Sequence, residues 1–264
     1  MLSKEEITRY SRNILLSEVG KKGQEKLKNS TVTVIGAGGL GSPALFYLAA
    51  CGIGNLRIVD SDTLDLTNLQ RQILHTTDFI SKPKTDSALQ SLKKLNPWIN
   101  VETFSVRANA ENVRSIIDGS QIVLEGSDNF ETKFLINDAC FFLKTPLLIG
   151  GILRFEGQLI GVIPGKTACY RCIFHSPPPP DEVPSCAEAG VIGGVAGVLG
   201  SLQATEAIKY LLQMEESGVF GKILNYDAKN CDFRKISMNK NPNCPLCGEH
   251  PSITELKDSA GRVC

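Results

Sequence analysis

The most constraining feature of this sequence is a glycine-rich turn that joins an apolar run to a helix-forming segment. Residues 31–36 read TVTVIG, a short β-branched run typical of a buried strand. A helix is predicted over residues 42–51, and a second strand, LRIVD, over residues 56–60. A strand, a crossover helix and a second strand form a right-handed unit with parallel strands. The chain is therefore expected to be an α/β protein.

The alternation of strands and helices continues to about residue 150. The further predicted segments are helices over 84–95, 110–117 and 129–144, and strands over 101–106, 121–126 and 146–150. Alternation of this length predicts a doubly wound, Rossmann-like sheet that is mostly parallel.

After residue 151 the pattern indicates antiparallel strands. The segment RFEGQLIGVIP, residues 154–164, is predicted to form one strand pair, and residues 222–227 and 231–238 a second pair. A helix is predicted over residues 195–213, with small side chains on one face. We therefore expect the sheet to be continued by antiparallel strands.

Charge and composition exclude several functions. The chain has 28 basic and 28 acidic residues, so it has no net charge to attract nucleic acid or an anionic membrane. Its longest apolar stretch, residues 190–202, is too short and too rich in glycine to span a bilayer. Its 9 cysteines do not resemble a disulfide framework, and the first residues are unlike a signal peptide. We expect a reducing cytoplasmic location, with no nucleic-acid or membrane partner.

Four of the cysteines form two Cys-x-x-Cys pairs about seventy residues apart. Cys169 and Cys172 lie in TACYRCIF, and Cys244 and Cys247 lie in NPNCPLCGEH. Two such turns can bring four thiolates to the tetrahedral spacing that Zn²⁺ prefers. A redox Cys-x-x-Cys would open a helix after a strand and would need no second pair. The sequence predicts a closed, structural zinc site, which has no open position for chemistry.

The glycine-rich turn has the spacing of a nucleotide-binding loop. Gly36, Gly38 and Gly41 form Gly-x-Gly-x-x-Gly directly before the helix, with Gly39 inside the same turn. Glycines let the backbone approach a phosphate, and the helix N-terminus offers N–H donors. Asp60, at the end of the next strand, is placed to accept hydrogen bonds from ribose hydroxyls. This pattern predicts a nucleotide, and by itself it fits NAD, FAD, S-adenosylmethionine or ATP.

Polar and charged residues follow Asp60 at the edge of the sheet where such folds bind ligands. They are Asp62, Asp65, Asn68, Gln70, Arg71 and, farther along, Lys84. Cations stabilise the charge of a nucleotidyl transfer, whereas a nicotinamide site needs no cations aimed at a phosphate chain. Arg71 and Lys84 could each be a solvated surface charge. Together with the glycine loop they favour nucleotidyl transfer.

Asp128 lies in the sequence GSDN, directly after the strand over 121–126, and is expected at the same edge of the sheet. Its carboxylate could ligate Mg²⁺, and Asn129 beside it is a further candidate for contact with the nucleotide. The alternative role of Asp128 is to cap the helix that begins near Asn129, and both roles can hold at once.

These motifs resemble those of the ubiquitin-activating superfamily. GAGGLGSPALFYLAACGIGNLRIVDSDTLDLTNLQRQIL, the Lys84 segment, GSDN, CYRC, GSLQATEAIK and CPLCG occur in the order seen in that superfamily. The chain is most similar to the bacterial molybdopterin-synthase adenylyltransferases and their thiamine-pathway counterparts, over about residues 5–248. The resemblance implies that ATP and Mg²⁺ are used to adenylylate the C-terminal glycine of a small ubiquitin-fold sulfur-carrier protein ending in Gly-Gly, with release of pyrophosphate.

The resemblance also implies residue roles where the motifs match. The residues expected to contact the nucleotide are Gly39 in the phosphate loop, Asp60 at the ribose, Asn68, Arg71 and Lys84 at the phosphates, and Asp128 at the Mg²⁺. Arg12, in RYSRNILL, matches an arginine that family dimers supply to the partner subunit's ATP site, which implies a homodimer. Its alternative role is a charge on a helix surface. No side chain need act as a nucleophile, because the carrier's carboxylate attacks the α-phosphorus.

Cys186, in SCAEAG, falls where many relatives carry a conjugating or sulfur-handling cysteine. Its thiolate could form a thioester or an acyl disulfide with the carrier, and the alternative is a spare small side chain. Cys51 and Cys140 lie in apolar helical contexts and are expected to be buried. Cys231 and Cys264 indicate no function.

We expect residues 1–248 to form a single domain with two halves. Residues 1–150 would bind the nucleotide, and residues 151–248 would bind the carrier and hold the zinc. A crossover loop is expected at about 175–190, where a run of prolines forbids regular structure. Residues 249–264 show no clear periodicity and are predicted to be a flexible tail.

Other functions are compatible with parts of this pattern. An NAD-dependent oxidoreductase with a structural zinc would explain the glycine loop and Asp60 but would leave Arg71, Lys84 and Asp128 without a role. Such an enzyme would also need a general acid, and the chain has few candidates other than His75, His175 and His250. A non-catalytic protein that grips a small partner and a tRNA-modifying dehydratase of the same superfamily are the remaining alternatives.

Overall fold

The computed structural model describes residues 1–178, 189–214 and 218–258. In these residues the chain forms an eight-stranded sheet with the order β3-β2-β1-β4-β5-β6-β7-β8. The strands are β1 (Thr31–Ile35), β2 (Asn55–Val59), β3 (Asn100–Phe104), β4 (Ile122–Glu125), β5 (Leu147–Leu153), β6 (Glu156–Val162), β7 (Lys222–Asp227) and β8 (Asp232–Ser237).

The sheet changes from parallel to antiparallel pairing at β5. Strands β3, β2, β1, β4 and β5 pair in parallel, and β5 to β8 pair antiparallel. This order confirms the expected Rossmann-like half and its antiparallel continuation. The strand pair predicted over residues 154–164 is wrong, because this segment forms only β6, which pairs with β5. Apolar residues 151–153 extend β5, so the hairpin turns at Arg154, whose φ is 54°.

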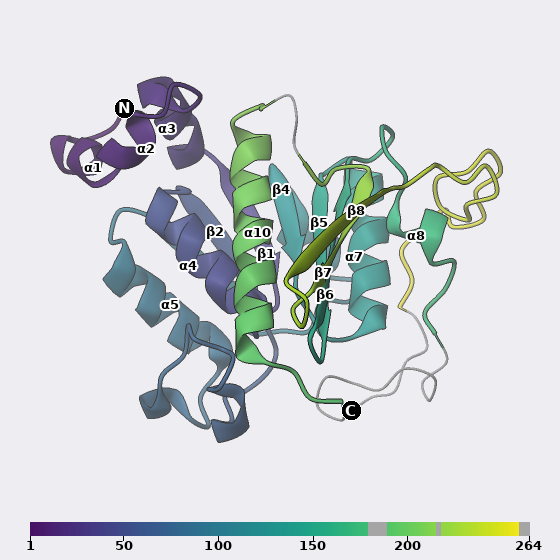
Figure 1. Cartoon of the computed structure of the whole chain (residues 1–264), viewed down its shortest axis with the longest axis horizontal. Coiled ribbons are helices and arrows are strands. Elements are labelled where there is room, and N and C mark those ends of the chain that lie inside the picture. The colour runs from purple at the N-terminus through teal and green to yellow at the C-terminus, as the bar shows by residue number, and fades with distance from the viewer. Residues whose placement is uncertain (179–188, 215–217, 259–264) are drawn as a thin grey trace.

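Helices cover both faces of the sheet (Figure 1). The first face carries α4 (Gly41–Cys51), α5 (Lys84–Leu95) and α10 (Gly193–Leu211), and the second carries α6 (Val113–Ile117) and α7 (Phe130–Leu143). Neighbouring side chains of a strand alternate between two cores: Leu124 lies in the first core and Val123 in the second. The doubly wound architecture predicted from the sequence is therefore confirmed.

Three short helices at the N-terminus lie far from the glycine loop. They are α1 (Lys4–Arg9), α2 (Ser11–Ile14) and α3 (Gly20–Lys28). Gln24 Nε2 donates to the carbonyl of Cys51 at 2.7 Å, and Asn96 Nδ2 donates to the hydroxyl of Tyr10 at 2.8 Å. These contacts lie at the C-terminal end of α4, whereas the glycine loop precedes its first residue. A helix of this length separates the two ends by about 16 Å, at about 1.5 Å per residue.

The first part of the predicted flexible tail is packed against the protein. Backbone N–H groups of Ser252 and Ile253 both donate to the carbonyl of Pro245 at 2.9 Å. The N–H of Ala110 donates to the Asp258 carboxylate at 2.9 Å, and Leu256 packs on the second core. Residues 249–258 thus differ from the expectation, because apolar side chains and polar contacts hold them without regular secondary structure. Residues 259–264 lie outside the described part of the chain.

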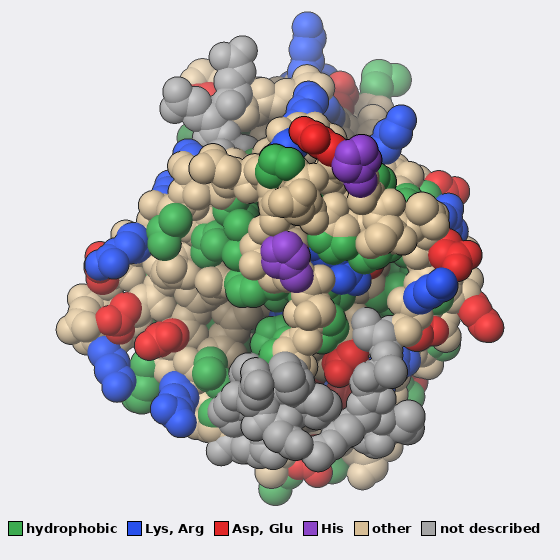
Figure 2. Space-filling view, turned by 90° about the vertical axis from the view of Figure 1, so that its right-hand side faces the viewer, with side chains coloured by type: hydrophobic (Ala, Val, Ile, Leu, Met, Phe, Trp, Pro, Cys, Tyr) green, Lys and Arg blue, Asp and Glu red, His purple; other side chains and the backbone are tan. Residues whose placement is uncertain are grey.

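The described surface carries charges of both signs. On the face shown in Figure 2, Lys and Arg side chains are interspersed with Asp and Glu side chains around the rim. This described face therefore offers no broad basic field for nucleic acid. Within the described residues, each helix is either too short or too polar to cross a lipid bilayer.

Candidate nucleotide and metal sites

The glycine loop between β1 and α4 has room only for glycine at two positions. A Cβ at Gly41 would lie 1.9 Å from the carbonyl oxygen of Gly36, so a larger residue would break the turn. Gly36 has a φ of 90°, in the left-handed region that favours glycine. A Cβ there would lie 3.1 Å from the Gly126 carbonyl oxygen, which shows how closely this loop approaches the turn after β4. The glycine loop and the turn after β4 therefore lie side by side.

Asp60 supports the glycine loop from the end of β2. Its Oδ2 accepts a hydrogen bond from the N–H of Ala37 at 2.8 Å, and its Oδ1 accepts from the N–H of Asp62 at 2.9 Å. Burial raises the pKa of Asp60, and nearby Lys84 opposes that change. Each carboxylate oxygen has a second lone pair, so the group can still accept from ribose hydroxyls.

Lys84 is a buried cation beside this loop. Its Nζ lies 2.7 Å from Asp62 Oδ2, and its side chain is only 7% exposed. Lys84 is also the first residue of α5, where the helix dipole disfavours a positive charge by about 0.3–1 kcal/mol. Helix stability would favour an acidic residue at this position, and the ion pair with Asp62 offsets the unfavourable placement of the charge.

Arg71 reaches the glycine loop from a short turn of 3₁₀ helix, η1 (Leu66–Asn68). Asn68 Oδ1 accepts from the N–H of Asp65 at 3.2 Å, and this reciprocal cap shapes the turn. Arg71 Nη1 donates to the Thr67 carbonyl at 3.1 Å. A Cβ at Gly39 would lie 3.6 Å from Arg71 Cδ, so the arginine lies over the loop. Gln70 is exposed beside it.

Asp128 is exposed in the turn after β4, next to the glycine loop. The cap of α7 is formed by Asn129, whose Oδ1 accepts from the N–H of Thr132 at 2.8 Å. The alternative role of Asp128 as the helix cap is therefore wrong. An exposed carboxylate suits Mg²⁺, which prefers oxygen ligands.

Two buried residues of the site were not proposed as ligand contacts from the sequence. Gln72 is buried, its amide lies near Gly38, and its Oε1 accepts no hydrogen bond from the described residues. A buried acceptor of this kind is normally satisfied, so this atom fits a donor from a bound nucleotide or water. His75 Nε2 lies 2.8 Å from the Ala37 carbonyl oxygen, and Nδ1 lies 3.0 Å from Ser87 Oγ. His75 thus joins the glycine loop, through Nε2, to helix α5, through Nδ1.

A buried ion pair below Asp128 was also missed. Lys133 Nζ lies 2.6 Å from Glu125 Oε2, and the carboxylate is fully buried. The available signal was a glutamate in the otherwise apolar strand IVLE, because a buried acid requires a partner.

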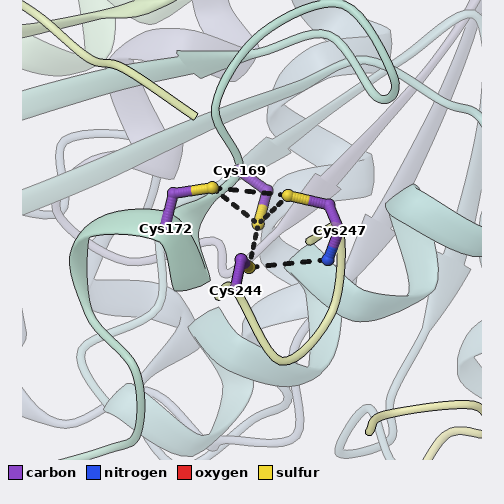
Figure 3. Close-up of side chains that lie close together, drawn as sticks. All are labelled: Cys169, Cys172, Cys244 and Cys247. Carbon is purple, nitrogen blue, oxygen red and sulfur yellow. Dashed lines mark hydrogen bonds between the residues drawn. The ribbon is translucent and has the colours of Figure 1, made fainter. Parts of the chain in front are cut away.

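The four paired cysteines lie together and point toward one another (Figure 3). Cys169 and Cys172 flank the start of the short helix α8 (Tyr170–Ile173), and all four sulfurs lie within 4.8 Å of one another. The Sγ–Sγ distances include 3.6 Å from Cys169 to Cys244 and 3.3 Å from Cys172 to Cys247. A tetrahedral site with Zn–S bonds of about 2.3 Å has sulfurs about 3.8 Å apart, close to these values.

Backbone donors surround the cysteine cluster. The N–H of Asn241 donates to Cys172 Sγ and that of Cys247 to Cys244 Sγ, each at 3.5 Å. Burial and repulsion by the neighbouring thiolates raise the pKa of Cys169. A divalent cation would reverse that effect by stabilising the thiolates. The residues present therefore fit a closed site for Zn²⁺, as the sequence predicted.

Among the described residues that were predicted for the site, Arg12 is not brought to the glycine loop of its own chain. Arg12 is exposed on α2, which packs beyond the far end of α4. Cys186 lies outside the described residues, as does Cys264. Cys140 is a buried free cysteine and Cys51 is a partly buried one, and burial raises the pKa of Cys51 to about 12. The expected burial is confirmed for Cys140, whereas Cys51 packs against the first core and stays partly exposed, and Cys231 is exposed.

The structure is an α/β protein with a glycine loop of the kind that binds nucleotides and a cluster of four cysteines whose geometry fits a metal ion. The model of the ThiF family matches residues 10–246, and the chain belongs to this family.

Relatives and solved structures agree with this family. A sulfur carrier protein adenylyltransferase from Thermus thermophilus is 45% identical over 97% of this chain and 96% of its own length. The SAMP-activating enzyme E1 of Haloferax volcanii is 46% identical over 92% of this chain and 90% of its own length. The adenylyltransferase and sulfurtransferase MOCS3 of Anopheles gambiae is 43% identical, and the chain covers 58% of it. A crystal structure of Escherichia coli MccB with ATP is 26% identical, with a TM-score of 0.79 over 90% of this chain and 74% of that one.

Removal of one thiolate should destabilise the protein, because a structural metal contributes directly to folding. We expect Cys244→Ser to lose bound zinc in metal analysis and to lower the melting temperature, and chelation of the wild type to have a similar effect. Cys231→Ser, at an exposed cysteine, is the control and should match the wild type. Equal melting temperatures of the wild type with and without chelator would contradict a structural metal.

Acid should weaken the contribution of His75 to stability. Burial lowers the pKa of His75 from its usual 6.5, so the unfolded chain takes up the proton first as the pH falls. The stabilisation by neutral His75 is fully present above the pKa of the unfolded chain. It is lost as the pH falls from that pKa to the lower pKa of the folded protein. The difference in unfolding free energy between wild type and His75→Gln should therefore shrink from pH 7.5 to pH 5. A His75→Gln difference that stays constant over this pH range would refute the assignment.

Proposed function

We propose that this protein uses ATP to adenylylate the C-terminal glycine of a small ubiquitin-fold sulfur-carrier protein, with release of pyrophosphate. The observation that carries the proposal is the buried cation Lys84 beside the glycine loop, at a helix N-terminus that disfavours it. Such a cation suits a triphosphate and has no role in hydride transfer. The names of the Thermus and Haloferax relatives support the same reaction.

The proposed reaction needs placed charges rather than a protein nucleophile. A carboxylate oxygen of the carrier attacks the α-phosphorus, and the bond from that phosphorus to the bridging oxygen of pyrophosphate breaks. The electron pair of that bond leaves with pyrophosphate. Arg71 and Lys84 would stabilise the negative charge that gathers on the phosphates. Asp128 would hold Mg²⁺, which neutralises phosphate charge when bound.

The glycine loop and its neighbours would bind the remainder of ATP. Asp60 would accept from the ribose hydroxyls, and Gln72 Oε1 would accept from the nucleotide or a bound water. Asn68, Gln70 and Asn129 remain candidate contacts with the phosphates. The chemistry is the same for carriers of molybdopterin and of thiamine synthesis, so the proposal names the class of carrier.

We propose that Zn²⁺ occupies the cysteine cluster and that the protein acts in a reducing cytoplasm, which keeps these thiols reduced. The cluster joins two segments of the antiparallel half, and this half would bind the carrier. Loss of the metal should therefore loosen carrier binding before it weakens ATP binding.

We also propose a homodimer in which Arg12 completes the ATP site of the partner subunit. Arg12 cannot reach the glycine loop of its own chain, because the length of α4 separates them. The same end of the molecule exposes large apolar side chains, with Leu15 73%, Leu16 55% and Tyr47 58% exposed. An apolar surface of this kind suits contact with a second copy.

Exchange of labelled pyrophosphate into ATP tests the reaction. We expect wild-type protein to catalyse exchange with a carrier ending in Gly-Gly, and Arg71→Ala to abolish it without lowering the melting temperature. Arg114→Ala, at an exposed arginine of α6 on the second face of the sheet, is the control and should exchange normally. Absence of exchange with every such carrier, together with binding of a nicotinamide cofactor, would refute the proposal.

Mixing two inactive variants tests the shared site. The Arg12→Ala subunit keeps all the ATP-site residues of its own chain, and the Asp128→Ala subunit keeps Arg12. A mixed dimer therefore contains one complete ATP site. Equal amounts, after subunit exchange, should recover about a quarter of wild-type activity, because half of the dimers are mixed and each has one working site. No recovery in mixtures shown by mass measurement to contain mixed dimers would contradict a site completed by Arg12.

A further inference from the structure

Lys133, on the first turn of α7, is held by three acceptors at the end of the sheet. Its Nζ donates to Glu125 Oε2 at 2.6 Å, to the Ser127 carbonyl at 2.8 Å and to the Gly150 carbonyl at 2.7 Å. These acceptors belong to the end of β4, the turn that follows it and the neighbouring strand β5. One ammonium group thus uses its three protons to join three segments.

Glu125 holds the same turn from the opposite side. Its Oε1 accepts from the N–H of Ser127 at 2.8 Å and also from the Ser127 hydroxyl. Ser127 is therefore bound through its N–H and hydroxyl by the acid, and through its carbonyl by the lysine. Asp128 is the next residue, so the backbone that carries it is fixed by the ion pair.

Stability alone is a poor explanation for this pair. Glu125 is fully buried and Lys133 nearly so. Two buried charges lose so much hydration that well-packed apolar residues of similar volume are often as stabilising or more so. What apolar residues could not supply is the set of hydrogen bonds to the Ser127 backbone. The pair thus has a geometric effect that its contribution to stability does not account for.

We propose that Lys133 and Glu125 are positioning residues that aim the Asp128 carboxylate at the metal of Mg·ATP. The inference rests on the proposed function, in which Asp128 holds Mg²⁺. Neither residue touches the nucleotide. Outer groups that orient a metal ligand commonly change metal affinity about 10–100-fold when they are removed.

A second buried ion pair on the same helix provides a matched control. Arg171 Nη2 lies 2.7 Å from Asp138 Oδ2, and both side chains are mostly buried. This pair joins α7 to the α8 segment beside the cysteine cluster, away from the Asp128 turn. The two pairs share a helix and a buried setting, and they differ in the segment that they hold.

The test replaces each pair with apolar residues together, so that no buried charge is left alone. Lys133→Met with Glu125→Leu should keep a melting temperature close to that of the wild type. Its affinity for Mn²⁺ in the presence of ATP, measured by water proton relaxation, should fall about tenfold. Its affinity for ATP without a divalent ion, measured by calorimetry, should not change. Pyrophosphate exchange should need more Mg²⁺ for half-maximal rate.

The control variant, Asp138→Leu with Arg171→Met, should bind Mn²⁺ with the same affinity as the wild type. Ser127→Gly, a variant that keeps both buried charges, should weaken Mn²⁺ binding in the same direction and by less. Unchanged Mn²⁺ affinity in the Lys133 and Ser127 variants, or an equal loss in the Arg171 control, would overturn the positioning role while leaving the proposed function intact. Wild-type protein that exchanges no pyrophosphate and binds no Mn²⁺ with ATP would overturn both.

Discussion

The close approach of the turns after β1 and β4 determines where the candidate ligand residues lie. The parallel register places Ile35 opposite Glu125, so the two strands end at the same level. Beyond that level the backbone of Gly36 lies close to Gly126, with little space for a side chain between them. The glycine loop and the Asp128 turn therefore share one edge of the sheet. A phosphate chain over that edge can meet backbone N–H groups on one side and a carboxylate on the other.

Helix α7 connects that edge with the cysteine cluster through separate polar contacts. Lys133, near its first turn, binds the Asp128 turn. Farther along, Asn137 Oδ1 accepts from the N–H of Tyr170 at 2.9 Å, and Asp138 pairs with Arg171. Both contacts hold residues between Cys169 and Cys172. Because each group of buried polar atoms finds its partners locally, the helix can position two chemically different sites.

Features that depend on a local sequence pattern could be predicted from the sequence. Features that depend on which segments pack together could not. Glycine spacing and strand periodicity predicted the parallel half, and Cys-x-x-Cys spacing predicted the cluster of thiols. The hairpin was misplaced because an apolar run can extend a strand past a glycine pair, and only its partner strand decides where it ends. Lys133 reads as an ordinary helix residue, since its partners Glu125 and Gly150 lie on two other segments. The positions of Arg71, Lys84 and Asp128 could be expected from topology, but the caps and buried acceptors around them could not.

The distribution of thiols agrees with a site that works by placed charge. Among the described cysteines, four are gathered in the cluster, Cys140 is buried, and Cys51 is partly buried against the first core. Burial raises the pKa of both Cys140 and Cys51, because a thiolate would lose its hydration there. Cys231 lies in the turn between β7 and β8, away from the glycine loop. The described groups that would face a nucleotide in the proposed reaction are cations, carboxylates and backbone donors. Such groups stabilise charge on phosphorus and leave the attack to the carboxylate of an incoming substrate.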